Sequence, residues 1–494
     1  MSNLAVLPIL MPLIAGILVA FIHKKTTLVR NISKGLAIIN LVIVGLVFMQ
    51  VRDQGSIVLE MGSWEAPFGI VLVGDLLAMT LVLTTNIIAV ACVFFAPQSL
   101  SEKEESYYFY SFFFLLISGV SGAFLTGDLF NLFVFFEVLL MASYGLIVLG
   151  NGKAQLRESI KYVLINLFSS MLFVTTIAFL YSVVGTVNMA QAAQRVQEVE
   201  QQGILTTIAI LFFFVFATKA AVFPLYYWLP RPYISPNPVV SALFGALLTK
   251  VGIYSILRTF SLIFNHEVGL THTLFIYLAA FTMIFGVVGA ISTNNIKLIV
   301  AYNIIPAVGF MLMGIGIFTE VSISGTVYYL VHDMVIKGVL FLLVGATAYV
   351  AGTSDLRKMG GLIHHYPVLG WLLFIASLVL AGIPPFSGFM GKLQLLRGGL
   401  GEEEIFIVII GLVSSLLILF SMIRIFIRGF WGEKMDIPIP ERKKTGNLMV
   451  LPAAGLLTVS VLLGVGAEWF FPTIESISQY LMDPEIYIDS VIKE

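Results

Sequence analysis

Charged residues are scarce in this sequence, and their scarcity excludes an ordinary soluble protein. Only 11% of the 494 residues are Asp, Glu, Lys or Arg, whereas 59% are hydrophobic. Soluble domains carry about 25% charged residues. The net charge of −1 also gives no reason to expect nucleic acid or another polyanion as a partner. The composition therefore predicts an integral membrane protein with many transmembrane spans.

Cysteine and the motifs of cofactor chemistry are nearly absent. Cys92 is the single cysteine and lies in the apolar run NIIAVACVFFA, so neither an internal disulfide nor a paired-cysteine metal site is available. The sequence has no GxxxxGK[ST] loop, no G-x-G-x-x-G loop and no HExxH motif. We therefore expect no cofactor and no metal site. The free energy for any transport must come from an ion gradient or from a partner protein.

Long apolar runs fill most of the chain. A helix needs about 20 apolar residues to cross a bilayer, and this rule predicts an all-α polytopic membrane protein with about 14 transmembrane helices. The predicted spans are 4–22, 34–51, 68–96, 107–126, 128–150, 160–186, 204–229, 238–263, 271–292, 297–318, 323–351, 367–397, 403–429 and 447–467. We expect residues 1–470 to form one transmembrane domain and residues 471–494 to form a surface tail.

The distribution of lysine and arginine predicts the orientation of the spans. If both termini face outside, most of the 27 cations fall in cytoplasmic loops, as the positive-inside rule requires. The outer loops would then hold only Arg52, Arg195, Arg258, Arg397 and Lys493. An even number of spans with both ends outside is the prediction.

Two of the predicted spans are interrupted. The seventh contains Phe223-Pro224, and the twelfth contains GIPPFSG at 382–388. Proline removes a backbone donor and clashes with the preceding turn. Interrupted helices in corresponding positions of two halves indicate a transporter site. We therefore expect two inverted five-helix repeats, spans 4–8 (107–263) and spans 9–13 (271–429), with spans 1–3 (1–106) and the last span (447–467) at the periphery.

A lysine and a glutamate are the first ionisable residues expected to be functional. Lys219 lies in LFFFVFATKAAVFPLYYWLP, where an ammonium group costs roughly 3 kcal/mol on insertion scales. Desolvation disfavours its charged form, so it can release and regain a proton. Glu137, in DLFNLFVFFEVLLMASYGLIVLG, is the expected partner that tunes it. The alternatives are a fixed structural ion pair at Lys219 and a protonated Glu137 that only hydrogen-bonds a neighbouring helix.

Three more lysines and a histidine extend this set. Lys250 can relay protons toward the second half, or be held by Tyr254. Lys337 lies one turn after Asp333, so a purely local i,i+4 pair is the alternative to a relay that includes His332. Lys392 follows the second break and is expected to be a terminal proton site, or to reach toward the outer surface beside Arg397.

Two aspartates, Asp75 and Asp128, lie near the starts of spans. Such residues commonly cap helix N-termini. Helix capping is the simpler interpretation of both.

These motifs together resemble a known family. The chain is similar to the antiporter-like membrane subunits shared by respiratory complex I, membrane hydrogenases and Mrp-type multisubunit sodium/proton antiporters. The resemblance covers roughly 65–430 and rests on several motifs: Glu137, FATKAAVFPLYYWLP, SPNPVVSALFGALLTKVGIY, AYNII at 301–305, the His332–Lys337 pair and GIPPFSGF at 382–389. Within the family, the length, the lysine after GIPPFSGF and the short tail are most similar to the D-type subunits of Mrp antiporters. Ile305-Pro306 departs from the polar residue and histidine of many relatives.

The resemblance implies a proton-translocating subunit of a sodium/proton antiporter that works with companion subunits in a bacterial cell membrane. It implies that protons move along Glu137, Lys219, Lys250, His332, Lys337 and Lys392. One alternative is a proton-pumping subunit of a redox-driven complex, and another is a passive scaffold. The cost of four buried lysines argues against the scaffold.

Overall fold

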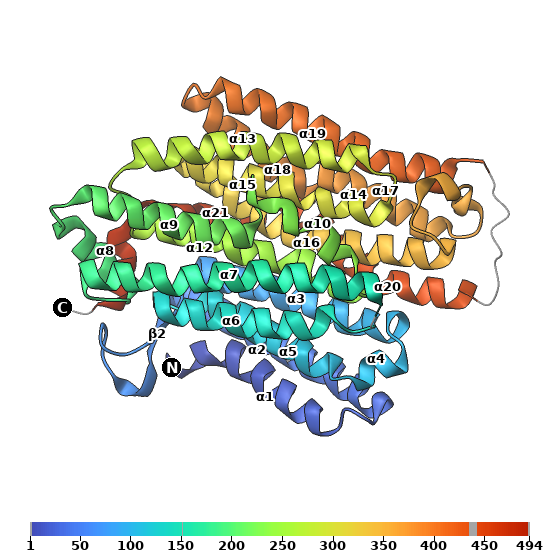
Figure 1. Ribbon diagram of the computed structural model, residues 1–494, viewed down its shortest axis with the longest axis horizontal. Helices are drawn as coiled ribbons and strands as arrows, with labels where there is room; N and C mark the ends of the chain where they lie inside the picture. Colours follow the sequence, from blue (N-terminus) through green and yellow to red (C-terminus); the bar gives the residue numbers. More distant parts are fainter. Residues whose placement is uncertain (1, 151, 434–441, 493–494) are drawn as a thin grey trace.

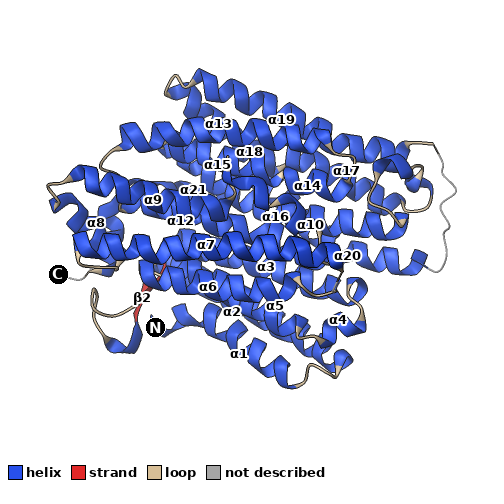
Figure 2. Ribbon diagram, viewed as in Figure 1, coloured by secondary structure: helices blue, strands red, loops and turns tan. Residues whose placement is uncertain are grey.

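The structure is a computed structural model that describes residues 2–150, 152–433 and 442–492. Nearly all of this chain is helical (Figure 2). The helices of the first half are α1 (Leu7–Phe21), α2 (Thr26–Gln54), α3 (Leu76–Ser99), α4 (Glu102–Ser106), α5 (Phe109–Leu125), α6 (Leu129–Ile147), α7 (Lys153–Val184), α8 (Met189–Glu198), α9 (Gln202–Ala220), α10 (Pro230–Ile234), α11 (Pro238–Leu243) and α12 (Thr249–Leu262).

The second half continues in the same way. Its helices are α13 (Val268–Ser292), α14 (Ile296–Tyr302), α15 (Ile304–Ile317), α16 (Glu320–Ala351), α17 (Pro367–Ala381), α18 (Ser387–Gly401), α19 (Ile405–Ile425), α20 (Arg442–Val465), α21 (Ala467–Met482) and α22 (Pro484–Val491). Short 3-10 turns lie at Ser2–Val6, Met61–Ser63, Leu225–Trp228, Leu356–Lys358 and Leu362–His364, and π-helical turns lie at Phe244–Leu248 and Phe426–Trp431.

The long helices run side by side along the long axis of the molecule, and both chain ends lie toward the same end (Figure 1). At that same end, β1 (Ile57–Glu60) and β2 (Val71–Gly74) form an antiparallel hairpin in which Ile57 pairs with Gly74. Because the helices satisfy their own backbone hydrogen bonds, this arrangement suits a bilayer.

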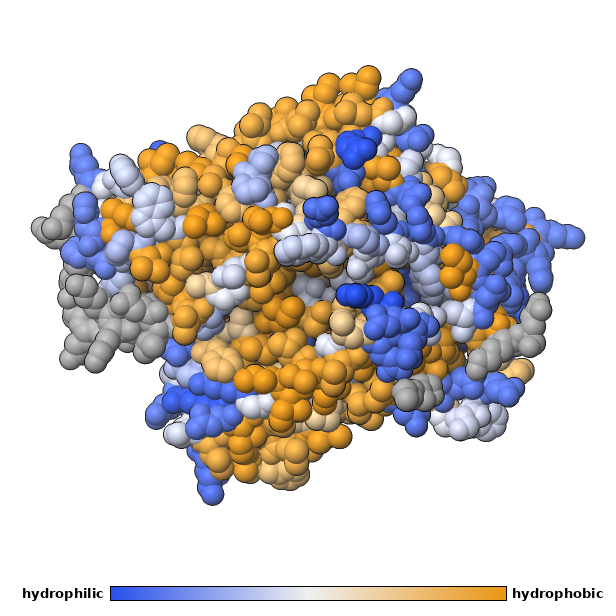
Figure 3. Space-filling model, turned by 180° about the vertical axis from the view of Figure 1, so that it is seen from behind, coloured by the Kyte–Doolittle hydropathy of each residue, from blue (hydrophilic) through white to orange (hydrophobic). Residues whose placement is uncertain are grey.

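Eleven helices of the described chain are long and apolar enough to cross a membrane, and the bent pair α20–α21 makes a twelfth. The prediction of an all-α polytopic membrane protein is therefore confirmed. The two other predicted spans, 107–126 and 367–397, correspond to the shorter apolar helices Phe109–Leu125 and Pro367–Ala381, the latter continuing after a break as α18. The lateral surface seen in Figure 3 is mainly hydrophobic, with hydrophilic residues concentrated toward the two ends and in a patch between them.

Both predicted helix breaks are present. Helix α9 ends at Ala220, and Ala221 adopts a left-handed conformation with φ of 65° before the Pro224 turn. Helix α17 ends at Ala381, Gly382 has φ of 85°, and α18 begins at Ser387. Two further irregularities, the π-helical turn before Lys250 and the interruption between α14 and α15 at Asn303, were not predicted from the sequence.

Two isolated β-bridges occupy related positions in the two halves. One joins Asp128 to Asn188 and the other joins Asn295 to Asp355, each linking residues about 60 apart in the chain. By the predicted topology the first bridge lies at the outer end and the second at the cytoplasmic end. This reversal is what inverted repeats would produce, although the five-helix repeats themselves remain a prediction.

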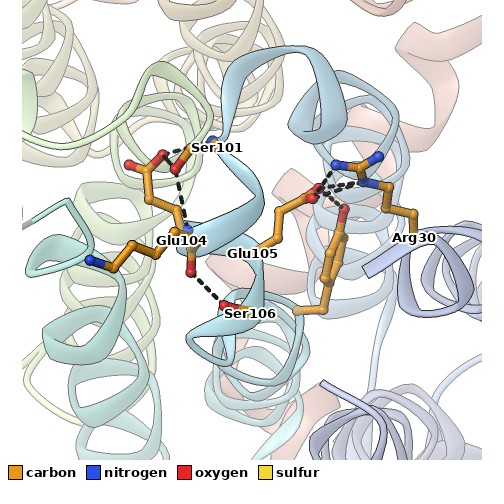
Figure 4. A network of polar contacts seen from close by, with 7 residues as sticks. Arg30, Ser101, Glu104, Glu105 and Ser106 are labelled. Atoms are coloured by element: carbon orange, nitrogen blue, oxygen red, sulfur yellow. Dashed lines mark hydrogen bonds and ion pairs between the residues drawn. The ribbon is translucent and has the colours of Figure 1, made fainter. Parts of the chain in front are cut away.

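Capping hydrogen bonds and an ion pair stabilise the helix ends in the first half. Asp75 and Asp128 cap α3 and α6, accepting from the backbone N–H of Ala78 at 2.8 Å and of Asn131 at 2.7 Å. Figure 4 shows a third junction, in which Ser101 and Glu104 form a capping box on α4 while Arg30 of α2 pairs with the neighbouring buried Glu105. The capping role expected for the two aspartates is confirmed.

The C-terminal segment packs on the membrane domain. Helix α21 turns by 79° from α20, so the predicted boundary near residue 470 falls inside a helix. Ile474, Ile477 and Leu481 of α21 are buried, as are Tyr487 and Ile488 of α22. The exposed Glu475 and Glu485 lie on the opposite faces, which agrees with an amphipathic tail.

Candidate functional site: a row of buried lysines

Lys219 lies in the last turn of α9, just before the first helix break, and is only 4% exposed. Its Nζ donates to the carbonyl oxygen of Asn166 at 3.1 Å and to Oγ of Ser170 at 3.0 Å, both on α7. The ammonium group is also 6.0 Å from the ring centroid of Phe136. All of these partners are uncharged, so this lysine can change its protonation state without leaving a buried counter-charge unpaired.

Glu137 follows Phe136 on α6 and is half-buried, with no hydrogen-bond partner for its buried Oε1. Among the described residues it forms no ion pair within 4.0 Å. It is near enough to Lys219 for an electrostatic interaction. The structure therefore places the predicted partners close together without direct contact, and the acceptors from α7 fill the place that the sequence suggested for Glu137.

Three charges meet at the centre of the molecule. Nζ of Lys250, on α12, lies 2.8 Å from Oδ2 of Asp333, on α16. Nζ of Lys337 lies 3.4 Å from Oδ1 of the same aspartate. All three side chains have 0% exposure. The local pair between Asp333 and Lys337 exists, but Asp333 is closer to Lys250, so it joins the two lysines rather than serving one.

Backbone carbonyls complete the coordination of both lysines. Lys250 donates to the carbonyl oxygen of Gly245 at 2.6 Å, in the π-helical turn. Lys337 donates to the carbonyl oxygen of Asn303 at 2.8 Å, where α14 and α15 are interrupted. Each unpredicted irregularity thus supplies an acceptor to a buried ammonium group. Irregular backbone at membrane depth is tolerated where buried groups satisfy it.

His332 lies next to Asp333 and is fully buried. Its Nδ1 lies 2.8 Å from Oγ of Ser387, which in turn lies 3.0 Å from Oγ of Ser460 on α20. Nε2 has no hydrogen-bond partner. The histidine therefore connects the start of α18 with α20, and one ring nitrogen stays available.

Lys392 lies on α18, after the second break. Its Nζ donates to the carbonyl oxygens of Ala381 at 2.8 Å and Leu380 at 3.3 Å, at the end of α17. It also lies 4.9 Å from the ring centroid of Phe310. The lysine is 4% exposed and faces the break, so the alternative in which it reaches toward the outer surface is wrong in this conformation.

Close helix packing holds these residues in series. A Cβ atom on Gly252 would lie 2.7 Å from the backbone nitrogen of Ala220, so glycine permits α12 to approach α9 beside Lys219. A Cβ atom on Gly391 would lie 3.0 Å from Cα of Tyr329, so α18 approaches α16 beside Lys392 in the same way. Helix α12 therefore packs on α9 and α18 packs on α16, while the π-helical turn Phe244–Leu248 that precedes α12 contacts α16.

One buried ion pair was missed by the sequence analysis. Arg258, assigned there to an outer loop, lies inside α12, and its Nη2 pairs with Oδ2 of Asp75. The guanidinium carbon also lies 5.2 Å from the ring centroid of Tyr487 on α22. The i,i+4,i+8 spacing of Lys250, Tyr254 and Arg258 was a signal that could have placed Arg258 on the buried face of this helix.

The neutral partners of the lysines and of His332 were not predicted either. Asn166, Ser170, Asn303, Ser387 and Ser460 are small polar residues in apolar segments, a pattern that carries little information by itself. No group of three or more His, Cys, Asp or Glu side chains capable of holding a metal ion occurs in the part of the chain that the structure describes.

A polytopic membrane protein that carries a series of buried lysines has the architecture of a membrane transport subunit. The sequence model of the NADH:quinone oxidoreductase/Mrp antiporter transmembrane family matches residues 126–418. The chain belongs to this family.

The relatives extend the likeness over the whole chain. The D subunit of the Na(+)/H(+) antiporter from Bacillus subtilis (strain 168) is 50% identical over 494 residues, which is 100% of both chains. The D subunit from Alkalihalophilus pseudofirmus is 50% identical over 495 residues, again covering 100% of each. The resemblance to the D-type subunits of Mrp antiporters is therefore confirmed, and the named activity of these relatives is transport rather than enzymatic catalysis.

Solved structures give the same fold. A chain of the Mrp complex from Dietzia sp. DQ12-45-1b superposes with a TM-score of 0.92 at 28% identity, covering 99% of this chain and 100% of that one. A chain of respiratory complex I from Thermus thermophilus superposes with a TM-score of 0.82 at 22% identity, covering 97% and 100%. The second likeness shows the fold alone.

Proposed function

We propose that this chain is the proton-translocating subunit of a multisubunit Na+/H+ antiporter. The observation that carries the proposal is the series of buried lysines Lys219, Lys250, Lys337 and Lys392. The first two lie on the packed helices α9 and α12, the last two lie on the packed helices α16 and α18, and Asp333 joins the two pairs. The 50% identity to two antiporter D subunits supports sodium/proton exchange rather than redox-driven pumping. On this proposal the chain is part of a secondary transporter and not an enzyme.

Lys219 is the site at which a proton enters the series. Lys219 is held only by neutral acceptors, so protonation changes its charge without breaking an ion pair. The negative charge of Glu137 favours the protonated amine when the two residues are near one another. Movement of α6 relative to α9 would weaken that interaction and release the proton toward Lys250.

The central aspartate governs transfer through the middle. Because Asp333 contacts both Lys250 and Lys337, a proton gained by one lysine disfavours a second on the other. The aspartate can strengthen its contact with whichever lysine is charged. His332 and Ser387 lie beside this cluster and can carry a proton toward Lys392, the terminal site at the second break.

We also propose a membrane location, an orientation and companion subunits for this chain. The protein resides in a bacterial cell membrane with both termini outside, as the distribution of loop cations indicates. It works with companion subunits, because the Bacillus subtilis relative is named as one subunit of an antiporter. Protons pass through this chain and sodium is the exchanged ion.

The test replaces the two residues of the first half separately. Lys219→Ala and Glu137→Ala are expected to abolish sodium-dependent proton movement in inverted membrane vesicles while the complex still assembles. Lys103→Ala changes an exposed cation outside the series and should leave antiport unchanged. Normal antiport in both site variants, at normal assembly, would remove the role assigned to Lys219 and Glu137.

A further inference from the structure

A cavity of about 520 Å³ opens beside the first helix break, away from the lysine series. It lies between the N-terminal part of α7, the turn Leu225–Trp228 with α10, and the end of α14. These segments lie toward the end of the molecule that holds the cation-rich loops. The volume falls within the range of about 300–1,000 Å³ typical of small-molecule sites.

Cations outnumber anions on the walls of this cavity. Arg157, Lys161 and Arg231 line it together with a single carboxylate, Glu158. Lys161 already pairs with Glu158 at 3.0 Å. Arg157 and Arg231 have no ion-pair or hydrogen-bond partner among the described residues. Two unpaired guanidinium groups, contributed by α7 and α10 to one cavity, favour a ligand with phosphate oxygens, which arginine binds in a bidentate manner.

Aromatic residues set the depth of the cavity in the membrane. Tyr226, Tyr227 and Trp228 form one wall, and Tyr227 is 79% exposed. Tyrosine and tryptophan concentrate at the level of lipid headgroups. The cavity therefore lies where phosphate groups of the bilayer are present.

An exposed apolar strip continues from the cavity along α7. Leu164 lines the cavity and is 59% exposed, and Ile160, Phe168 and Met171 are exposed on the same face at helical spacing. This strip supplies the surface that acyl chains require. A free anion or an acidic peptide would use the arginines but not the strip.

We propose that this cavity binds the headgroup of an anionic phospholipid, with the phosphate between Arg157 and Arg231 and the acyl chains along Leu164 and Phe168. The inference goes beyond proton transport and depends only on the membrane location of the chain. Trp228 also donates to the carbonyl oxygen of Thr218 at 3.0 Å. A lipid held against this wall would therefore contact the segment that follows Lys219.

The experiment measures lipid retention by the complete purified antiporter complex. Detergent-washed complex is supplied with phosphatidylglycerol or phosphatidylcholine, and bound lipid is counted by native mass spectrometry. We expect the wild type to retain phosphatidylglycerol selectively. Arg157→Gln/Arg231→Gln should lose that selectivity, with roughly a tenfold or larger fall in affinity for each guanidinium group removed, since hydrogen bonds to charged groups contribute about 1.5–3 kcal/mol.

The matched control removes two exposed cations from the same end of the molecule. Lys153→Gln/Lys358→Gln changes the net charge equally and lies outside the cavity, so it should retain phosphatidylglycerol like the wild type. The single variant Arg231→Gln gives a partial loss and serves if the double variant assembles poorly. Lys219→Ala should retain the lipid, which separates failure of this proposal from failure of the transport proposal.

Three results would overturn the proposal. Equal retention of phosphatidylglycerol by the cavity variant and its control would show that the arginines do not select the lipid. Arginine-dependent stabilisation of the complex by inorganic phosphate alone, to the same melting temperature as with phosphatidylglycerol, would identify a site for a free anion. Loss of companion subunits from the cavity variant in saturating phosphatidylglycerol would identify a protein-binding surface.

Discussion

The ends and the centre of the lysine series solve the burial of charge differently. At one end, Lys219 is coordinated by a carbonyl and a hydroxyl group, and its acidic neighbour Glu137 makes no direct contact. At the centre, Lys337 shares Asp333 with Lys250 and all three groups are inaccessible to solvent. A lysine with neutral partners is suited to gaining and losing a proton. A shared aspartate is suited to passing one proton between two sites.

Because their partners differ, the two kinds of lysine site should respond differently to mutation in transport activity and in stability. Removing a neutral acceptor from Lys219 leaves no buried counter-charge unpaired, so we expect transport activity to fall more than the stability of the protein. Removing the shared aspartate leaves two buried amines without a counter-charge, so we expect both transport activity and stability to fall.

The largest effect is expected from Asp333→Asn. Breaking a buried ion pair typically costs about 3–5 kcal/mol because an uncompensated charge remains. We expect loss of antiport together with a strong fall in the amount of assembled complex, measured by purification yield and melting temperature. The double variant Asp333→Asn/Lys250→Met removes one stranded cation and should recover part of the stability but not the transport.

The stability of the single variant Asp333→Asn decides whether the central lysines are charged. If Asp333→Asn alone were as stable as the wild type, Asp333 would not be holding charged lysines. The central cluster would then be neutral, and its difference from the Lys219 site would disappear.

An intermediate effect is expected from Ser170→Ala. The substitution removes one acceptor from Lys219 and leaves the Asn166 carbonyl in place. We expect antiport in vesicles to fall roughly tenfold, equivalent to about 1.4 kcal/mol, which is close to the lower limit for one hydrogen bond to a charged group. The complex should assemble normally.

Ser182→Ala is the matched control for this change. Ser182 lies on the same helix, is exposed, and donates only to the Phe179 carbonyl oxygen. Its replacement should leave transport unchanged. A destabilised Ser170→Ala complex with undiminished specific activity would mean that Ser170 supports packing rather than the lysine.

The smallest effects on transport are expected at the aspartates of the two β-bridges, whose replacement instead changes how stability depends on pH. Burial raises the pKa of Asp128 from 3.8 to about 6. Its contribution to stability is therefore full below about pH 4 and is lost as the pH rises through 6. Asp128→Asn keeps a capping side chain without titration, so its stability relative to the wild type should improve by roughly 2–3 kcal/mol between pH 4 and pH 8.

Asp355 provides the opposite case in the second half. Hydrogen bonding from Arg357 lowers the pKa of the Asp355 carboxyl group to about 2, so its contribution is present above about pH 4 and is lost as the pH falls through 2. Asp355→Asn should therefore show a constant melting-temperature difference from the wild type between pH 4 and pH 8. Similar pH profiles for the Asp128 and Asp355 variants would contradict the assigned environments.

The sequence predicted the breaks in the helices better than it predicted the partners of the buried charges. Proline and glycine identified both breaks, and both were found at the predicted positions. The pair of Asp333 with Lys337 was visible from i,i+4 spacing, but its closer contact with Lys250 was not. Arg258 was misassigned because hydropathy does not show that a cation near a helix end points toward a buried carboxylate.

The sequence by itself determined the membrane class, the approximate positions of the spans and the identity of the buried lysines, although the predicted span 68–96 includes the strand β2 and the helix there begins only at Leu76. These features depend on local properties: the length of apolar runs, the absence of a backbone donor in proline, and the cost of a charge in such a run. Only the tertiary structure decided which groups each lysine meets. Asn166 and Asn303 are remote in sequence from Lys219 and Lys337, and their carbonyls are directed by the packing of separate helices, which no local pattern encodes.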